Sequence, residues 1–218
     1  MWKRGLISWV VVAIAVAVAM PVSAEEVTVD REEMEMVDVD EAVRAENEAR
    51  RSRTIWGMGV LLGWSAVNMV TGAVGRARGE GPTRYFHEMN LGWNSVNAVI
   101  GGVGMAGALR EDPMARDAGE TMRASHDREK IFLVNVGLNA GYMAAGWALM
   151  ERGERLDDDR LRGYGPSLVL QGAFLLAFDA AMFGIQRRAT RRLEEELTVT
   201  PAVGITDESV RVGVRGRF

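Results

Sequence analysis

The chain of 218 residues has no cysteine and only two histidines. Without cysteine it has no disulfide framework, no covalent haem-attachment motif and no lipidated cysteine anchor. His87-Glu88 begins like a zinc-binding helix, but Leu91 stands where the H-E-x-x-H pattern needs its second histidine. Two histidines without thiols are too few for the common zinc and copper ligand sets, so we expect no metal and no other cofactor.

Basic stripes with interleaved aromatic residues are also missing, and the net charge is −4. This pattern does not favour a nucleic-acid partner. The sequence shows no phosphate-binding loop, no nucleophile next to a base and no paired catalytic carboxylates. An enzyme is therefore the less favoured class, although nothing here excludes one.

Charge is nearly absent from four long stretches, residues 54–75, 89–109, 131–150 and 164–186, where Asp179 is the one charged side chain. Each stretch has about 20 residues, which at about 1.5 Å per residue crosses a hydrocarbon core of about 30 Å. Helices of a soluble bundle would carry a charged stripe on the side facing water. The predicted fold is therefore an all-α membrane protein, a bundle of four transmembrane helices over residues 54–186.

The N-terminal residues have the pattern of a signal peptide. Lys3 and Arg4 precede an apolar run, Pro21 follows it, and Val22-Ser23-Ala24 supplies small residues for cleavage. We predict a signal peptide over residues 1–24; the alternative is an uncleaved anchor helix. An acidic extracytoplasmic segment then covers residues 25–53.

Residues 187–218 form a polar tail. Within it, residues 197–205 and 209–218 alternate in polarity on either side of Thr206-Asp207-Glu208, a pattern that predicts a short β-hairpin.

The signal peptide predicts location in a bacterial inner (cytoplasmic) membrane, with the N-terminus of the mature chain extracytoplasmic. This orientation leaves more basic residues near the outer ends of the spans than near the inner ends, the reverse of the positive-inside rule. The two signals conflict, and the sequence alone leaves the orientation open.

Small residues repeat at four-residue spacing in the predicted spans. Such rows allow helices to approach closely in lipid, and they occur at Gly59 and Gly63, Gly104 and Ala108, Gly137 and Gly141, and Ala173, Ala177 and Ala181. We expect these rows to be contact surfaces.

Polar side chains recur inside the spans. We predict a polar pocket formed by Asn68, Asn97, Asn135, Asn139, Gln171 and Asp179. If the faces point inward, Asn68, Asn97, Asn139 and Asp179 lie within about 6 Å of mid-depth.

Two interpretations of these polar residues stay open. As interhelical packing groups, they would contribute about 0.6 kcal/mol per hydrogen bond. As a site, they would account for a carboxyl that costs about 2.5–3.5 kcal/mol at the centre of a span.

A second group, His87, Glu88 and Arg152, is expected at one membrane edge. Ion pairing at the interface is its simplest interpretation. If the protein were a membrane enzyme, these three residues would be the acid–base group to test.

Several segments resemble an uncharacterised bacterial family of small four-helix membrane proteins. They are Tyr85-Phe86-His87-Glu88-Met89-Asn90, Glu151-Arg152-Gly153, Arg160-Leu161-Arg162-Gly163-Tyr164-Gly165 and Leu170-Gln171-Gly172-Ala173-Phe174-Leu175-Leu176-Ala177-Phe178-Asp179. The likeness extends over residues 54–186. It implies a four-helix membrane domain and no particular activity.

Two functional hypotheses follow. The first is a non-enzymatic membrane protein that binds or passes a small solute at the polar pocket around Asp179. The second is a structural scaffold or assembly subunit that recruits a periplasmic partner through its soluble ends. The lipid bilayer is an expected partner in both, and a homo-oligomer or another membrane protein is compatible with either.

Overall fold

A computed structural model describes residues 39–197, 199–206 and 209–216. Within these ranges the chain forms four helices followed by two strands, namely α2 (Val39–Arg78), α3 (Gly81–Arg110), α4 (Ala118–Leu156), α5 (Asp159–Glu196), β1 (Val199–Thr206) and β2 (Ser209–Gly216). The predicted signal peptide and the first part of the acidic segment lie outside the described residues.

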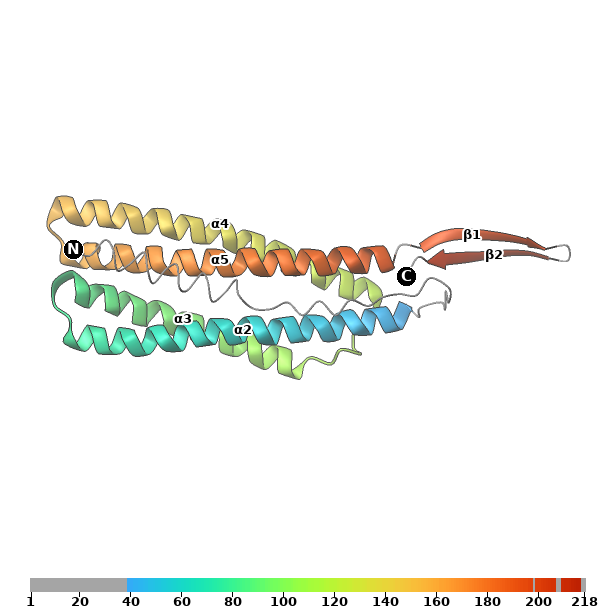
Figure 1. Cartoon of the computed structure of the whole chain (residues 1–218), viewed down its shortest axis with the longest axis horizontal. Coiled ribbons are helices and arrows are strands. Elements are labelled where there is room, and N and C mark those ends of the chain that lie inside the picture. Colours follow the sequence, from blue (N-terminus) through green and yellow to red (C-terminus); the bar gives the residue numbers. More distant parts are fainter. Residues whose placement is uncertain (1–38, 198, 207–208, 217–218) are drawn as a thin grey trace.

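The helices form two hairpins, α2 with α3 and α4 with α5, which lie side by side with both short turns at one end (Figure 1). The first turn contains Gly81, whose φ of 52° suits glycine. In the second turn, Asp157 takes a left-handed conformation after α4, and the Asp158 side chain accepts the first free N–H groups of α5. These tight turns make each helix antiparallel to the next, and α3 and α5 form the main contact between the hairpins.

The two strands pair antiparallel, from Val199 opposite Gly216 to Thr206 opposite Ser209. They extend beyond the end of α5, away from the helical turns (Figure 1). Asp207 and Glu208, which join them, lie outside the described residues.

Three of the four helices are long and apolar enough to cross a membrane: Glu41–Arg78, Ala118–Leu156 and Asp159–Glu196. The sequence predicted four spans, and α3 is not among the three because its asparagines and glycines lower its mean hydropathy. The helix α2 has 40 residues, which corresponds to about 60 Å, twice the thickness of a hydrocarbon core. A membrane would therefore surround only part of each long helix.

Near the two short turns, side-chain hydrogen bonds connect the ends of the charge-free segments. Glu88, just before the segment of α3, accepts hydrogen bonds from Arg76 of α2 and Tyr164 of α5, at 3.1 and 2.6 Å. These three residues lie at the ends of three different charge-free segments.

The opposite ends of the segments are aligned in the same way. Arg187, just after the segment of α5, pairs with Glu129, just before that of α4, at 2.9 Å. Arg128 bonds Thr54, the first residue of the segment of α2. We call residues 54–75, 89–109, 131–150 and 164–186 the apolar layer. We call residues 41–53, 110–130 and 187–197 the head.

The outer surface of the apolar layer is aliphatic. Val67, Val99, Val103 and Val134 are all about 60–70% exposed, and such a surface is typical of a membrane-contacting protein.

Of the predicted small-residue rows, that of Gly104 and Ala108 lies at a helix contact: Ala108 is 4% exposed, and a Cβ at Gly104 would lie 2.6 Å from Met58 Sδ. Other close contacts occur at glycines outside the predicted rows. A Cβ at Gly165 would lie 2.4 Å from Met150 Cγ, and one at Gly146 would lie 2.7 Å from the Gly165 carbonyl oxygen. At Gly63, Gly137 and Gly141 a Cβ would meet nothing among the described residues within 4 Å. The prediction for those rows was wrong because spacing shows only that residues share a face, and tertiary packing decides which face meets a neighbour.

Candidate functional site

Asn90 of α3 is the centre of a buried hydrogen-bond network. Its Nδ2 donates to Asn68 Oδ1 of α2 at 3.0 Å, and its Oδ1 accepts from Ser167 Oγ of α5 at 3.2 Å and from Gln171 Nε2. Asn90 is 3% exposed, and Ser167 and Gln171 are fully buried. One amide therefore joins three helices.

The remaining polar atoms of this network are also engaged. Gln171 Oε1 accepts from the indole N–H of Trp64 at 2.9 Å, and Asn68 Nδ2 donates to the Trp64 carbonyl oxygen. The Trp64 ring stacks on Phe174, with centroids 3.9 Å apart. We call Asn68, Asn90, Ser167 and Gln171 the amide cluster. The hydrogen bonds among these side chains join different helices.

Asp179 lies in a second cluster, between α4 and α5. Its two carboxylate oxygens accept from Asn139 Nδ2 at 2.7 Å and from Asn135 Nδ2 at 3.4 Å. Asp179 is 5% exposed and Asn139 3%. Within the described ranges no basic side chain pairs with Asp179, so two neutral amides hold a buried carboxyl. We call these three residues the carboxyl cluster.

Five of the six residues predicted as one pocket are thus divided between two levels. Asn68 and Gln171 belong to the amide cluster, whereas Asn135, Asn139 and Asp179 form the carboxyl cluster. Asp179 follows Gln171 by eight residues, about 12 Å along α5.

The physical reason for this division is the register of the first hairpin, which places Asn68 opposite Asn90 rather than near Asn139. Asn90 was not among the predicted pocket residues, and nothing in the sequence singled it out as the hub.

Asn97 belongs to neither cluster. It is 5% exposed, and its Nδ2 has no hydrogen-bond partner among the described residues. The Oδ1 of Asn94, one turn earlier on α3, is buried and equally unpartnered. The middle of α3 therefore keeps two unused polar atoms inside the apolar layer.

The predicted edge group His87, Glu88 and Arg152 does not assemble. Glu88 is held by Tyr164 and Arg76, and the hydrogen bond from Tyr164, followed by that from Arg76, lowers its pKa. His87 packs so closely on α2 that a Cβ at Gly75 would lie 2.2 Å from its Cδ2. Arg152 is exposed and forms no ion pair in the part of the chain that the structure describes.

A family model, the family of unknown function DUF6992, matches residues 60–180. The chain belongs to this family. The expected membership in an uncharacterised family is confirmed, while bacterial origin stays a prediction. A search of curated proteins and a search of solved structures each found no significant match.

The DUF6992 region contains both polar clusters, but it excludes the head segments of α2 and α5. The head has its own buried polar groups: Asn47, Thr121 and Ser125 are fully buried and Arg50 is 1% exposed. Arg50 Nη2 bonds Glu111 Oε1 at 2.6 Å. The head therefore buries charge, which the apolar layer does only at Asp179.

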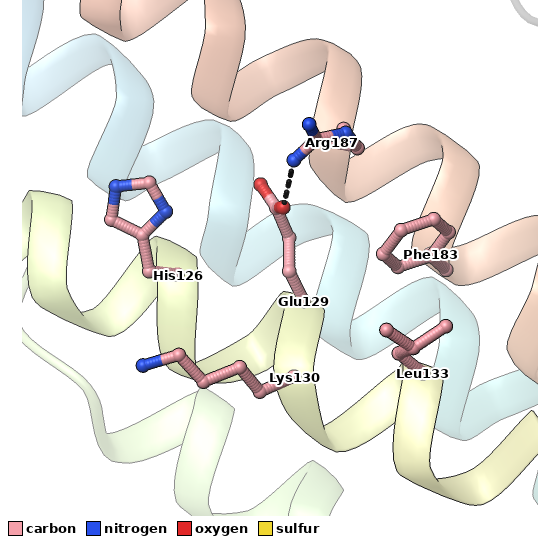
Figure 2. Close-up of a pocket in the computed structure, with 6 residues that line it drawn as sticks. All are labelled: His126, Glu129, Lys130, Leu133, Phe183 and Arg187. Carbon is pink, nitrogen blue, oxygen red and sulfur yellow. Dashed lines mark hydrogen bonds and ion pairs between the residues drawn. The ribbon is translucent and has the colours of Figure 1, made fainter.

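A groove of about 490 Å³ lies where the head meets the apolar layer, between α4 and α5 (Figure 2). Arg187 reaches across it to Glu129, beside His126 and Lys130, while Leu133 and Phe183 line the opposite end (Figure 2). Its lining thus changes from charged to apolar at the boundary. Across the described ranges, no three histidine or acidic side chains are grouped as metal ligands.

Proposed function

We propose that this protein is an integral membrane scaffold in which all four helices cross the bilayer and hold a helical head outside it. The observation that carries the proposal is the contrast along the helices. Polar side chains in the apolar layer bond one another between helices, whereas the same helices continue beyond it as a charged, cross-linked head. A partner would assemble on that head.

The length of the head supports this role. Residues 41–53 of α2 continue for about 20 Å beyond the apolar layer at about 1.5 Å per residue. Interhelical links such as Arg187–Glu129 and Thr121–Asn47 hold the projecting helices together. A rigid extension of this kind presents a defined surface, which a membrane anchor alone does not need.

With the signal peptide predicted from the sequence, the proposal puts the head outside the cytoplasm and its partner in the periplasm. The absence of cysteine permits a direct test with single introduced thiols. We expect Glu48→Cys, exposed in the head, to react with a membrane-impermeant maleimide in intact cells. Arg78→Cys, exposed at the opposite turns, should react only after lysis. Equal labelling of both positions in intact cells would overturn the predicted topology.

The scaffold role itself is tested by site-specific photocrosslinking in cells. A photoreactive residue at Glu48 or Arg123 of the head should form a defined protein adduct. The same residue at Val70, on the lipid-facing surface, should not. Adducts from Val70 alone would move the partner into the membrane, and no adduct from any of the three positions would contradict the scaffold.

The solute hypothesis remains the second candidate, and one observation favours it. Asn94 Oδ1 and Asn97 Nδ2 are buried without partners, as a polar occupant in the apolar layer would require. The variant Asp179→Asn separates the two functions when its thermal stability is measured in detergent. If Asp179 is a packing group, the variant loses about 1–3 kcal/mol, because its new amide N–H faces the donors of Asn135 and Asn139. A gain in stability would instead indicate a strained carboxyl kept for a ligand.

A further inference from the structure

Inside the head, α2 and α4 are fastened side by side by two cross-links. Thr121 Oγ1 donates to Asn47 Oδ1 at 3.1 Å, and Arg128 donates to Thr54. Both links join residues 74 positions apart, so the two helices run parallel in a single register. Arg50 and Ser125 therefore lie between the two links, on facing helices.

The polar atoms between these links are left unsatisfied. Arg50 Nη2 donates a hydrogen bond to Glu111. Arg50 Nε and Nη1, Asn47 Nδ2 and Ser125 Oγ have no hydrogen-bond partner among the described residues. Asn47 and Ser125 are fully buried, and Arg50 is 1% exposed. A buried donor without an acceptor is costly, and more so when it is charged. Each of these four atoms can donate a hydrogen bond, so a group that satisfies them has to be a hydrogen-bond acceptor.

The charges around this position point to an anion rather than a neutral acceptor. Glu111 is shared by Arg50 and Arg116, at 2.6 and 3.1 Å, and Glu46 pairs with Arg53. Arg128 lies near Arg50, Arg116 and Arg53, which repel it, and near Glu111, which attracts it. Its hydrogen bond goes to the neutral Thr54. Arg50, Arg53, Arg116 and Arg128 thus lie together with two carboxylates, Glu111 and Glu46, which pair with three of them. This part of the head therefore has an excess of positive charge.

We propose that the head binds a phosphate group between α2 and α4, held by Arg50, Asn47 and Ser125. Guanidinium N–H groups form charge-assisted hydrogen bonds with phosphate oxygens, while the amide and the hydroxyl supply neutral donors. This site depends on the fold of the head and goes beyond the scaffold role. The phosphate site can therefore be disproved while the scaffold role stands, and the scaffold role can be disproved while the phosphate site stands.

The test is thermal unfolding of the full chain, purified in detergent and chloride, while inorganic phosphate replaces chloride at constant ionic strength. A ligand that binds only the folded state stabilises it by RT ln(1 + [L]/Kd), so the Tm keeps rising with the logarithm of the ligand concentration once the site is filled. We expect the Tm to rise by several degrees as the phosphate concentration increases. Besides the chloride and phosphate samples, a third sample contains a short-chain phosphatidylglycerol in the same detergent. A rise with inorganic phosphate identifies a free anion, and a rise only with the lipid places the same phosphate group on a headgroup.

Two variants locate the response. Arg50→Gln should abolish it. Because that variant also breaks the Glu111 bridge and can unfold the head, Ser125→Ala is the milder partner: it removes one donor and should weaken phosphate binding about tenfold. Ser95→Ala, whose hydroxyl bonds only its own helix, and Arg188→Gln, an exposed arginine of the head, serve as controls. Both should respond like the wild type.

Three results would overturn the site. They are a wild type whose Tm in either phosphate source equals its Tm in chloride, a response that Arg50→Gln retains in full, and a response that Ser125→Ala retains in full. An equal loss in Arg188→Gln would show general screening of the basic head rather than binding at Arg50.

Discussion

The apolar layer and the head both bury polar side chains completely, but the buried side chains differ in charge. In the apolar layer Ser167 and Gln171 are fully buried, and in the head Asn47 and Ser125 are. The difference lies in charge, because the head also buries Arg50, whereas the apolar layer links its helices with neutral amides. Neutral amides satisfy one another without an ion in lipid. Buried polarity therefore does not distinguish the two regions. The head buries side chains of both charges, among them Arg50 and Glu129, whereas the apolar layer buries one carboxyl, that of Asp179.

The helix α3 is not among those apolar enough to cross a membrane because asparagines lower the mean hydropathy of its charge-free stretch. Its asparagines at positions 90, 94 and 97 are all buried, whereas Val96, Val99 and Val103 are exposed by 59–69%. An average over this stretch counts both faces equally. The apolar outer face supports the proposal that α3 also crosses the bilayer.

The largest expected effect comes from breaking the amide cluster at its hub. Asn90→Leu removes three interhelical hydrogen bonds and leaves Asn68 Oδ1 and the donors of Ser167 and Gln171 without partners. At about 0.6 kcal/mol for each bond in a membrane protein, the loss should be about 2 kcal/mol. Thermal or denaturant unfolding in detergent measures it.

Salt distinguishes this effect from one in the head. Because the amide cluster carries no charge, the loss in Asn90→Leu should not change with ionic strength. Ser95→Ala is its control, since that hydroxyl bonds only the Leu91 carbonyl of the same helix. A loss as large in the control as in Asn90→Leu would show that the network adds nothing beyond helix packing.

The sequence was sufficient to predict the four helices of the described chain, three of which are long and apolar enough to cross a membrane. Such helices depend on a simple property, the absence of charge over about 20 residues. The sequence could not provide the grouping of the polar residues. Asn68, Asn97 and Asn139 are alike as sequence positions, and only the register of each hairpin decides that Asn68 meets Asn90. The turns at Gly81 and Asp157 fix that register, and a shift of one helical turn would create a different network.

The head was the part that sequence reasoning missed. From the sequence, its helices were predicted to be an acidic segment and a polar tail in solvent, because charged residues are usually exposed. Burial of Arg50 requires Glu111 from a loop 61 residues away, and no local pattern reveals such a pair. The spacing of Asn47, Arg50 and Thr54 on one face of α2 was the available signal.

A smaller effect is expected from the ion pair at the boundary of the two regions. Arg187→Gln removes the charged partner of Glu129, whose side chain is 8% exposed. Loss of one member of a fully buried pair costs about 3–5 kcal/mol, but Arg187 is 49% exposed, so we expect about 1 kcal/mol. Unlike the loss in Asn90→Leu, this one should shrink as salt screens the pair.

Arg188→Gln is the matched control for that prediction. It removes the same charge from the next position, which is exposed, and should leave stability unchanged. If the two variants lose equal stability at every salt concentration, the Arg187–Glu129 pair contributes no more than the general charge of the head.

The smallest effect concerns Glu88, at the end of the apolar layer farthest from the head. Its hydrogen bonds from Tyr164 and Arg76 lower its pKa in the folded protein. A carboxyl with a lowered folded-state pKa stabilises the protein above its unfolded-state pKa of about 4.3, and that stability is lost as the pH falls through the folded-state value. Because Glu88 is 30% exposed, the contribution should stay below about 1 kcal/mol. Glu88→Gln should therefore lower the Tm slightly at neutral pH and reduce its fall below pH ~4. If the variant and the wild type lose stability in parallel on acidification, other carboxyls set the acid response, and ionic links between helices matter in the head but not at the turn end.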